Sequence, residues 1–558
     1  MYLHAFTHAS LSIRSFALCL LLLGYVAVTK AQTPASPFII GQGEVYSSAL
    51  QRYYEEITPR AEDKLAKVRY TIPMEIPQDT TYALVGLRSN YLSQDGVRAP
   101  YEGATETAGE LVAMGVANFK HRGRLSGYVS VGLGYQGAIG YSAIRQPEYY
   151  LPYLVADTSG GDYRYEHYIA GALYALRRGA SELGAGLHFA GEIAYKYEDP
   201  RVYNTTGTLQ ATLGYKHHFS SLDLSATLHA LYHRKYMNLW LWRPSQQDKF
   251  PLTYGFGMVD VQNTKIFFGT SRMHYMGGVA VDLLLRSRQR ELGAPHYTLL
   301  LSDQLYKMRT EESSAAGLFG LLNNNVRLLS SVGWGRCTLA LESSILHRLG
   351  TEYIYATHQP DQEHLTITDL RQIGQRQTYR QADYDAQLRG RYQIPLSSRH
   401  QLALSLGGGY HYHQELYKGS SNHIDYGVVR PWAGCDYRYS DRLYTALSVA
   451  YRLPLSSTYV VERGYKDQLD YQLAYLPLLS KLKSGLELRW HGQLSIPLPR
   501  SQAMTISVDA FYAPNRLTPR RPLYEGRPTT TSGIFSHPEL IGEQARSYGV
   551  LLSLTYHI

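Results

Sequence analysis

Long segments of this sequence alternate residue by residue between apolar and polar side chains. From Leu486 to Leu498 one register reads Leu, Leu, Trp, Gly, Leu, Ile, Leu, while the positions between them begin Glu, Arg, His, Gln, Ser. Successive side chains of a β-strand point to opposite faces, so this period of two predicts strands with one apolar and one polar face. The fold class is therefore all-β. The same pattern recurs in three further segments: Leu222–Tyr236, Arg376–Leu396 and Leu443–Leu455.

Three features separate these strands from those of a soluble β-sandwich. They are longer than the usual soluble strand of about 5–6 residues. Their apolar register carries Leu, Val, Ala and Gly in the middle and Tyr or Trp toward the ends, in a chain with 50 Tyr. Their other register is charged through the middle, where a membrane barrel has its polar lumen. The strands are therefore predicted to face lipid on one side and water on the other.

Short and long connections alternate along the chain. Short periplasmic turns and long external loops are typical of an outer-membrane barrel, and a sheet in hydrocarbon must close because an open edge leaves backbone groups unpaired. The pattern predicts a transmembrane antiparallel up-and-down β-barrel of about 18 strands, roughly 16–20. Asp467–Ser484 reads as a loop or an extra strand, and Ser287–His296 as an unusually long turn. The tight turns are Lys120–Arg124, Arg177–Ser181, Phe219–Ser221, Gly333–Arg336, Leu396–His400, Ser440–Arg442 and Leu498–Ser501.

The N-terminal region is predicted to be an export signal followed by a short extension. Phe16–Val28 is an apolar run too short to span a bilayer, and small residues precede a cleavage site after Ala31. Residues 1–31 are therefore a predicted signal peptide. Residues 32–80 are predicted to be a periplasmic or lumen-entering segment, and residues 81–558 the barrel. This organisation predicts the outer membrane of a Gram-negative bacterium.

Charge and cysteine content exclude some partners. The formal net charge is +9, and it is 9 − 2 = +7 without the first 31 residues, which hold Arg14 and Lys30 and no acid. The charges are scattered, as on a solvated surface or lumen, so no nucleic-acid partner is expected. Beyond the signal the only cysteines are Cys337 and Cys435. The sequence leaves open whether these two cysteines form a disulfide.

A histidine-rich strand offers a candidate metal site. In the stretch GGGYHYHQEL, His411, His413 and Glu415 lie at i, i+2 and i+4 and share the lumen face, about 6.6 Å apart per step. A His-x-His pair with a nearby Glu can bind zinc, copper or iron. The alternative is a polar lumen wall in a chain with 21 His. Apart from this metal ion, no cofactor is predicted.

A charged stripe precedes the histidine strand. Asp383, Asp385, Arg389 and Arg391 share one face of their strand, and the Leu396–His400 turn pairs that strand with the histidines. Charged rings select solutes in pores, so the stripe is a candidate lumen selectivity element. The alternative is solvation of the lumen wall.

The C-terminal stretch SYGVLLSLTYHI reads as a closing strand. Tyr548 and Tyr556 share its apolar register, and eight residues span roughly 26 Å along a strand. At the usual strand tilt this is about 20 Å of depth, which approaches the ~25 Å apolar band of such barrels. They are predicted membrane-interface aromatics. The stretch resembles the C-terminal signal read by the barrel-assembly machinery. That signal usually ends in an aromatic residue, whereas here Ile558 is last and the aromatic is Tyr556.

The TKAQ signal end, the Tyr-rich strands and the SYGVLLSLTYHI stretch together resemble the uncharacterised outer-membrane β-barrel proteins of the Bacteroidota, which are known only as domains of unknown function. The resemblance covers the chain after the signal. It implies an outer-membrane barrel embedded in lipid. Such families often accompany nutrient or metal uptake systems, so it also implies a partner uptake receptor, without assigning a role to any residue.

These observations favour a transport or binding protein over an enzyme. The motifs G-x-S-x-G and H-E-x-x-H are missing from the sequence, so no enzyme is predicted, and an outer-membrane hydrolase with a fortuitous Ser–His–Asp triad is the remaining enzymatic alternative. We expect passage or capture of a small hydrophilic solute. The rival is an accessory barrel with a plugged lumen that acts through its external loops with a partner receptor.

Overall fold

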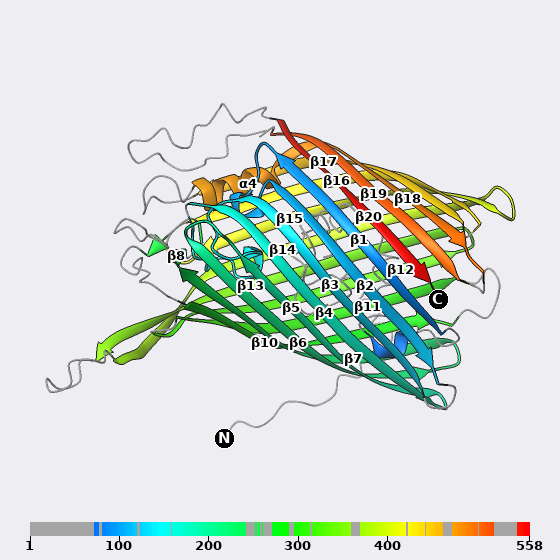
Figure 1. Ribbon diagram of the computed structural model, residues 1–558, viewed down its shortest axis with the longest axis horizontal. Helices are drawn as coiled ribbons and strands as arrows, with labels where there is room; N and C mark the ends of the chain where they lie inside the picture. The colour runs from blue at the N-terminus through cyan, green and yellow to red at the C-terminus, as the bar shows by residue number, and fades with distance from the viewer. Residues whose placement is uncertain are drawn as a thin grey trace, which may run out of the picture.

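The strands of this chain form one closed barrel (Figure 1). The computed structural model describes residues 72–76, 81–119, 123–157, 159–240, 252–253, 255–256, 259–260, 271–288, 295–312, 315–358, 369–419, 422–440, 442–460, 471–499, 502–517 and 544–557. Within these residues an 18-stranded sheet pairs each strand antiparallel with its neighbour in the chain and closes on itself. The predicted fold class and strand number are confirmed.

The barrel strands are long, and a separate two-stranded sheet lies in the loop between β7 and β10. The separate sheet consists of β8 (Leu252–Thr253) and β9 (Val259–Asp260). The barrel strands are β1 (Tyr82–Asp95), β2 (Thr105–Asn118), β3 (Arg124–Ile139), β4 (Gly161–Arg178), β5 (Ser181–Tyr195), β6 (Arg201–His218), β7 (Leu222–Trp240), β10 (Ser271–Ser287), β11 (His296–Glu312), β12 (Ala315–Trp334), β13 (Cys337–His358), β14 (Asp369–Pro395), β15 (His400–Tyr417), β16 (His423–Tyr439), β17 (Leu443–Val460), β18 (Lys483–Pro497), β19 (Ala503–Leu517) and β20 (Gln544–His557).

The two ends of the barrel differ in their connections. Short turns join β2 to β3, β4 to β5 and β6 to β7, and the same alternation continues to the β18–β19 turn. We call this the turn end; it lies on the right in Figure 1, beside the C-terminus. The longer connections gather at the opposite, loop end. In an outer-membrane barrel the turn end is periplasmic and the loop end is external.

The barrel closes between its first and last strands. β20 pairs with both β19 and β1, with Leu554 opposite Leu87 and Tyr548 opposite Ser93. The rings of Tyr548 and Tyr91 lie 6.2 Å apart across this seam. Because of the seam, every strand has two neighbours. All backbone N–H and C=O groups of the sheet can then form hydrogen bonds, as they must in hydrocarbon. Tyr556 lies in the same outward register as Tyr548, near the turn end.

Large apolar side chains cover the outer face. Leu213, Leu406 and Trp334 are 63%, 70% and 71% exposed, and many other outward Leu, Val and Tyr residues are exposed as well. A soluble protein rarely exposes a continuous apolar surface of this extent. The chain is therefore a transmembrane β-barrel of the outer-membrane type. Within the described ranges, no helix has the length and apolar character needed to cross a bilayer.

The ambiguous stretch before β18 is partly helical. Tyr471–Tyr475 forms the π-helical turn η6, and α4 spans Leu476–Lys481. Pro477 lies in the first turn of α4, where its missing N–H costs no helical hydrogen bond. Leu478 and Leu479 are buried against other loop-end residues. The extra strand considered from the sequence is thus replaced by helix.

The two cysteines do not pair. Cys337 on β13 and Cys435 on β16 are both free and exposed. Each shares its register with outward-facing apolar side chains, so both thiols face the lipid.

A short segment that precedes β1 is held inside the barrel near the turn end. This strap comprises residues 72–76, of which Pro73–Glu75 form the 3-10 helix η2. Ile72 and Met74 are buried with Leu284, Leu300 and Leu329 of the wall. A Cβ added to Gly214 would approach Met74 Cε to 2.4 Å. The wall is therefore recessed where the strap docks. The signal peptide and residues 32–71 lie outside the described residues.

Glu75 fixes the strap electrostatically. Its carboxylate lies 2.8 Å from Lys216 Nζ and 2.5 Å from Arg286 Nη1, and its side chain is only 6% exposed. Burial by itself would raise the pKa of Glu75, but the two cations and their hydrogen bonds outweigh burial, so the pKa lies below its ordinary value. The ionised carboxylate therefore stabilises docking.

The substitution Glu75→Gln should loosen the strap, since it removes the ion pairs that join the strap to Lys216 and Arg286. We expect amide hydrogen exchange of a peptide covering 72–76 to become at least about tenfold faster. In the wild type, protection should be full at neutral pH and should fall only when the pH drops below the ordinary pKa of a Glu side chain. Arg309→Gln, which breaks the exposed pair with Glu311, is the control and should change nothing at the strap. Unchanged exchange in Glu75→Gln would contradict this account.

Deletion of Gly549–Ile558 should abolish membrane insertion, because β1 and β19 would then present unpaired edges to hydrocarbon. Insertion is measured by heat-modifiable migration on a gel and by protection from protease in isolated outer membranes. A chain without residues 522–531, which lie between β19 and β20 in the sequence, keeps both of these strands whole and should insert. If the chain without Gly549–Ile558 still inserted, this strand would not be the closing one.

Candidate functional site

One long connection folds into the loop end of the barrel. This inward segment, residues 142–157, lies between β3 and β4 and carries the short 3-10 helix η5 (Pro147–Tyr149). Arg145, which is 1% exposed, forms ion pairs with Glu106 of β2, at 3.4 Å, and with Glu192 of β5. Its guanidinium also lies 3.4 Å from the ring centre of Tyr165. Lys235 of β7 donates a 2.8 Å hydrogen bond to the carbonyl of Arg145.

The inward segment also reaches the strands on the other side of the lumen. The hydroxyl of Tyr150 lies 2.8 Å from His233 Nε2 on β7. The ring of Tyr153 stacks on Phe319 of β12 with a centre-to-centre distance of 4.3 Å. Arg348 of β13 donates a 2.9 Å hydrogen bond to the carbonyl of Glu148. The segment therefore packs against the wall from β2 to β13. It does not fill the remaining part of the barrel opening at the loop end, which we call the mouth.

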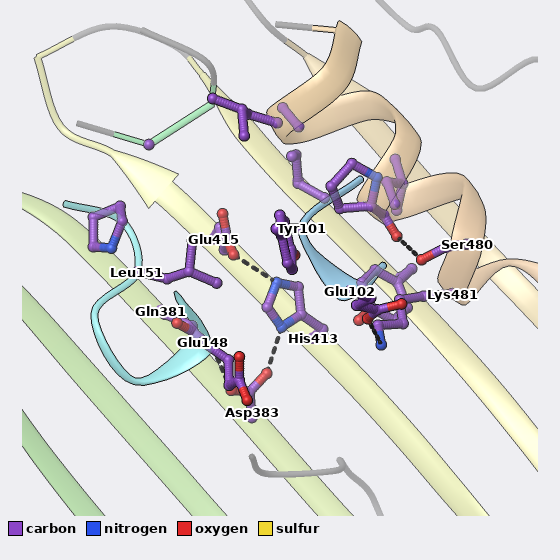
Figure 2. Close-up of a pocket in the computed structure, with 18 of the residues that line it drawn as sticks. Tyr101, Glu102, Glu148, Leu151, Gln381, Asp383, His413, Glu415, Ser480 and Lys481 are labelled. Atoms are coloured by element: carbon purple, nitrogen blue, oxygen red, sulfur yellow. Dashed lines mark hydrogen bonds and ion pairs between the residues drawn. The ribbon is translucent and has the colours of Figure 1, made fainter. Parts of the chain in front are cut away.

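A cavity of about 290 Å³ occupies that remaining part of the mouth (Figure 2). We call it the loop-end cavity. Strands β13 to β20 form one side of it, the inward segment another, and helix α4 a third. Its apolar lining includes Leu151, Pro152, Phe256, Ile424 and Leu478. Charged side chains face the same space, which gives the cavity an amphipathic lining.

The predicted histidine strand lines this cavity. Asp383 lies opposite His413 across the β14–β15 pair, and Gln381 lies opposite Glu415. His413 Nδ1 contacts the Asp383 carboxylate, while its Nε2 lies 3.0 Å from Glu415 Oε1. Both ring nitrogens thus face carboxylate oxygens, an arrangement that a doubly protonated ring satisfies. The ring also stacks on Tyr426 at 4.9 Å.

Of the other predicted site residues, His411 and Asp385 stay together, whereas the two arginines have other partners. His411 lines the cavity, and its Nδ1 lies 4.0 Å from Asp385. Arg391 instead pairs with Asp436 of β16 at 2.6 Å. Arg389 donates to Ser405 and lies 5.6 Å from the centre of the Trp432 ring. The structure therefore brings the acidic residues and the histidines together, but it does not place the two arginines beside them.

The metal site stays a prediction. Within the part of the chain that the structure describes, no group of three or more His, Cys, Asp or Glu side chains is placed to hold a metal ion. The nitrogens of His413 already contact Asp383 and Glu415, so a metal would have to displace one carboxylate from its present position.

The basic residues of the cavity come from helix α4 and from strands β17 and β18. Lys481, at the end of α4, lies 3.3 Å from Glu102 of the 3-10 helix η3 (Pro100–Glu102). Arg452 donates a 2.8 Å hydrogen bond to the carbonyl of Lys481. Lys483, two residues further along the chain, also lines the cavity. In Figure 2 the Lys481–Glu102 pair lies to one side of His413, and Asp383 and Glu415 flank the imidazole itself.

A buried cluster elsewhere in the lumen contains a serine, a histidine and an aspartate, but these three are not in the order of a Ser–His–Asp triad. Asp282 accepts a hydrogen bond from Ser302 and lies 3.0 Å from His229 Nε2. His229 Nδ1 lies 2.9 Å from the Thr212 hydroxyl. In a Ser–His–Asp triad the imidazole lies between the serine and the acid, whereas here the Asp282 carboxylate lies between Ser302 and the imidazole. The hydroxyl on the other side of the ring belongs to a threonine, Thr212. All four side chains are buried and none lines the loop-end cavity.

The model of a family of unknown function, DUF6850, matches residues 73–529. The chain belongs to this family. This confirms the expectation of an uncharacterised barrel family. A search of curated proteins finds no match to this DUF6850 chain.

Solved outer-membrane proteins show a distant likeness to the DUF6850 chain. The siderophore receptor PiuA from Acinetobacter baumannii is 7% identical, with 86% of this chain and 82% of that chain covered and a TM-score of 0.37. The outer membrane transporter YddB from Escherichia coli is 8% identical, with 86% and 81% covered and a TM-score of 0.37. The TodX monoaromatic hydrocarbon channel is 10% identical, with 87% and 92% covered and a TM-score of 0.29. At these scores the likeness carries no argument about function.

Zinc titration of the purified protein tests the metal prediction. We expect any zinc bound by His411 and His413 to be lost in the double variant His411→Ala/His413→Ala, because imidazole nitrogens supply the ligands. Binding is measured by isothermal titration calorimetry at neutral pH. The matched control is His217→Ala, which removes an imidazole beside the β6–β7 turn. Equal zinc binding by the wild type and the double variant would refute a metal site at His411 and His413.

Proposed function

We propose that this DUF6850 barrel captures a small, dipolar hydrophilic solute in the loop-end cavity and passes it through the outer membrane. One observation carries the proposal: the cavity presents acidic and basic side chains from different elements toward a single space. Ligand sites combine an apolar lining with a few placed polar groups that fix orientation. The loop-end cavity has both components.

The charges of the cavity favour a zwitterion over a solute with one sign of charge. Asp383 and Glu415 on the strand wall suit a cationic group such as an ammonium. Lys481, Arg452 and Lys483 suit an anionic group such as a carboxylate. Charge-assisted hydrogen bonds are the stronger class, so a solute that matches both sides gains from each. A singly charged solute would face unfavourable charge at one end.

The volume of the cavity supports a small solute. A volume of about 290 Å³ is just below the usual range of ligand pockets, roughly 300–1,000 Å³. Amino acids and short peptides have this size and the required dipole. The apolar residues Leu151, Pro152 and Phe256 suit the carbon skeleton of such a solute.

A binding barrel without passage is the second candidate, and two segments favour it. The inward segment packs against the wall from β2 to β13, and the strap docks near the turn end. Both segments narrow the route through the lumen. A protein of this kind would hold its solute at the external mouth and present it to a partner uptake receptor.

Calorimetric titration with the dipeptide alanyl-alanine tests the proposal, with glucose as a neutral hydrophilic solute of comparable size. We expect the dipeptide to bind and glucose to bind much more weakly. The substitutions Asp383→Asn and Lys481→Gln should each weaken dipeptide binding at least about fivefold, because each removes a charge on one side of the cavity. Arg164→Gln changes an exposed cation on the outer face and is the control.

Uptake of the labelled dipeptide into proteoliposomes separates the two candidates. Binding followed by entry supports passage, whereas binding without entry supports the binding barrel. If glucose and the dipeptide bound equally, or if neither charge substitution weakened binding, the capture of a dipolar solute would be refuted.

A further inference from the structure

A groove of about 470 Å³ crosses the outer face of the barrel over β5, β6 and β7. Phe189 of β5 borders it on one side, and Tyr232 and Tyr236 of β7 on the other. Gly207 and Leu209 of β6 form its floor. We call this feature the outer groove. It lies on the lipid-facing register and is separate from the loop-end cavity.

The groove exists because two glycines meet in the sheet. Gly191 of β5 lies directly opposite Gly207 of β6, so the sheet carries no side chain at either of these two positions. The ring of Phe189 lies over Gly191, 3.2 Å from where a Cβ would be, so the hollow itself is above Gly207. A Cβ added to Gly207 would meet nothing within 4 Å. Aromatic and aliphatic side chains continue on the turn-end side, where Phe189 lies opposite Leu209 and Leu209 opposite Tyr232. The result is a hollow with apolar walls that is open to lipid.

An arginine stands at the edge of this hollow. Arg234 of β7 lies directly opposite Gly207 and is exposed on the outer face. Its Nε lies 3.2 Å from Met273 Sδ, and its guanidinium lies 5.9 Å from the centre of the Tyr275 ring. Among the described residues, no carboxylate lies within ion-pair distance of Arg234. Within the described residues, the guanidinium therefore contacts a thioether sulfur and an aromatic ring but no counter-charge.

The depth of Arg234 matches the headgroup region. The outward register of β7 is apolar from Leu224 to Tyr232, and Arg234 is the next outward residue toward the loop end. Tyr236 follows it, as an aromatic residue does at the edge of the apolar band. The hollow at Gly207 thus lies at the border where lipid phosphates meet acyl chains.

We propose that the outer groove binds a single phosphate-bearing lipid from the leaflet at the loop end. One acyl chain lies over Gly207 and Leu209, between Phe189 and Tyr232. The lipid phosphate accepts hydrogen bonds from the guanidinium of Arg234. Charge complementarity selects this occupant, since an unpaired guanidinium at headgroup depth matches a phosphate and has no match in a neutral lipid.

The groove distinguishes this site from an arginine that merely reaches toward headgroups. Long cationic side chains near a bilayer surface extend to any nearby phosphate. Here the chain-binding hollow and the cation lie side by side, so the two parts of one lipid are held together. Arg164 of β4 provides the comparison: it is exposed on the same outer face and packs over the Tyr197 ring.

Native mass spectrometry of the full-length protein tests the site, with phosphatidylglycerol as the probe and diacylglycerol of the same chains as the neutral lipid. The wild type should retain one phosphatidylglycerol and no diacylglycerol. Arg234→Gln should weaken retention at least about fivefold through loss of the charged contact. Gly207→Leu should weaken it comparably by filling the hollow, and it has room to do so without disturbing the sheet.

Two matched variants control for general effects. Arg164→Gln removes an outer-face arginine, and Gly109→Leu fills another outward glycine whose added Cβ meets nothing within 4 Å. Both should retain the lipid as the wild type does, and a large excess of inorganic phosphate should not displace it. Retention that is equal in all five proteins would overturn the proposal. So would retention that is lost equally in the control variants, or a lipid displaced by inorganic phosphate alone.

Discussion

The structure depends on one constraint: backbone N–H and C=O groups in hydrocarbon must find partners within the protein. The seam between β1 and β20 meets that constraint for the whole sheet, since it removes the last two edges. A seam of this kind works only if the outward register of both strands is apolar. The pairing of Leu87 with Leu554 across it, and of Tyr91 with Tyr548 beside it, shows how the alternation of the sequence serves closure.

Closure also determines what the interior can do. A closed ring turns the polar register inward, and the chain then places two further segments inside it. The strap is held near the turn end by the ion pairs of Glu75, and the inward segment is held near the loop end by those of Arg145. The side chains of Glu75 and Arg145 are both buried charges with two oppositely charged partners. Buried ion pairs of this kind fix the position of a segment more than they add to the free energy of unfolding. The loop-end cavity is the part of the mouth that the inward segment does not fill.

The sequence pattern predicts the strands well and the loops poorly. A period of two is a local property, so it identifies the strands, their outward faces and the juxtaposition of Asp383 with His413 through one tight turn. It cannot show that Arg145 reaches Glu106, 39 residues away, or that Arg348 reaches Glu148, 200 residues away. The Lys481–Glu102 pair joins residues 379 apart and needs the closed barrel to exist. The helix α4 was missed for the same reason, because its apolar residues are buried only by contacts across the mouth.

Single-channel conductance in planar bilayers tests the central claim most directly, which is that the inward segment restricts the mouth and so forms the cavity. The comparison is the wild type against a variant in which residues 143–156 are replaced by a short Gly-Ser linker, both in potassium chloride. The account predicts a small conductance for the wild type and a severalfold larger one for the variant, with the same barrel in both. Equal conductances would contradict it, because the inward segment would then impose no restriction on the lumen.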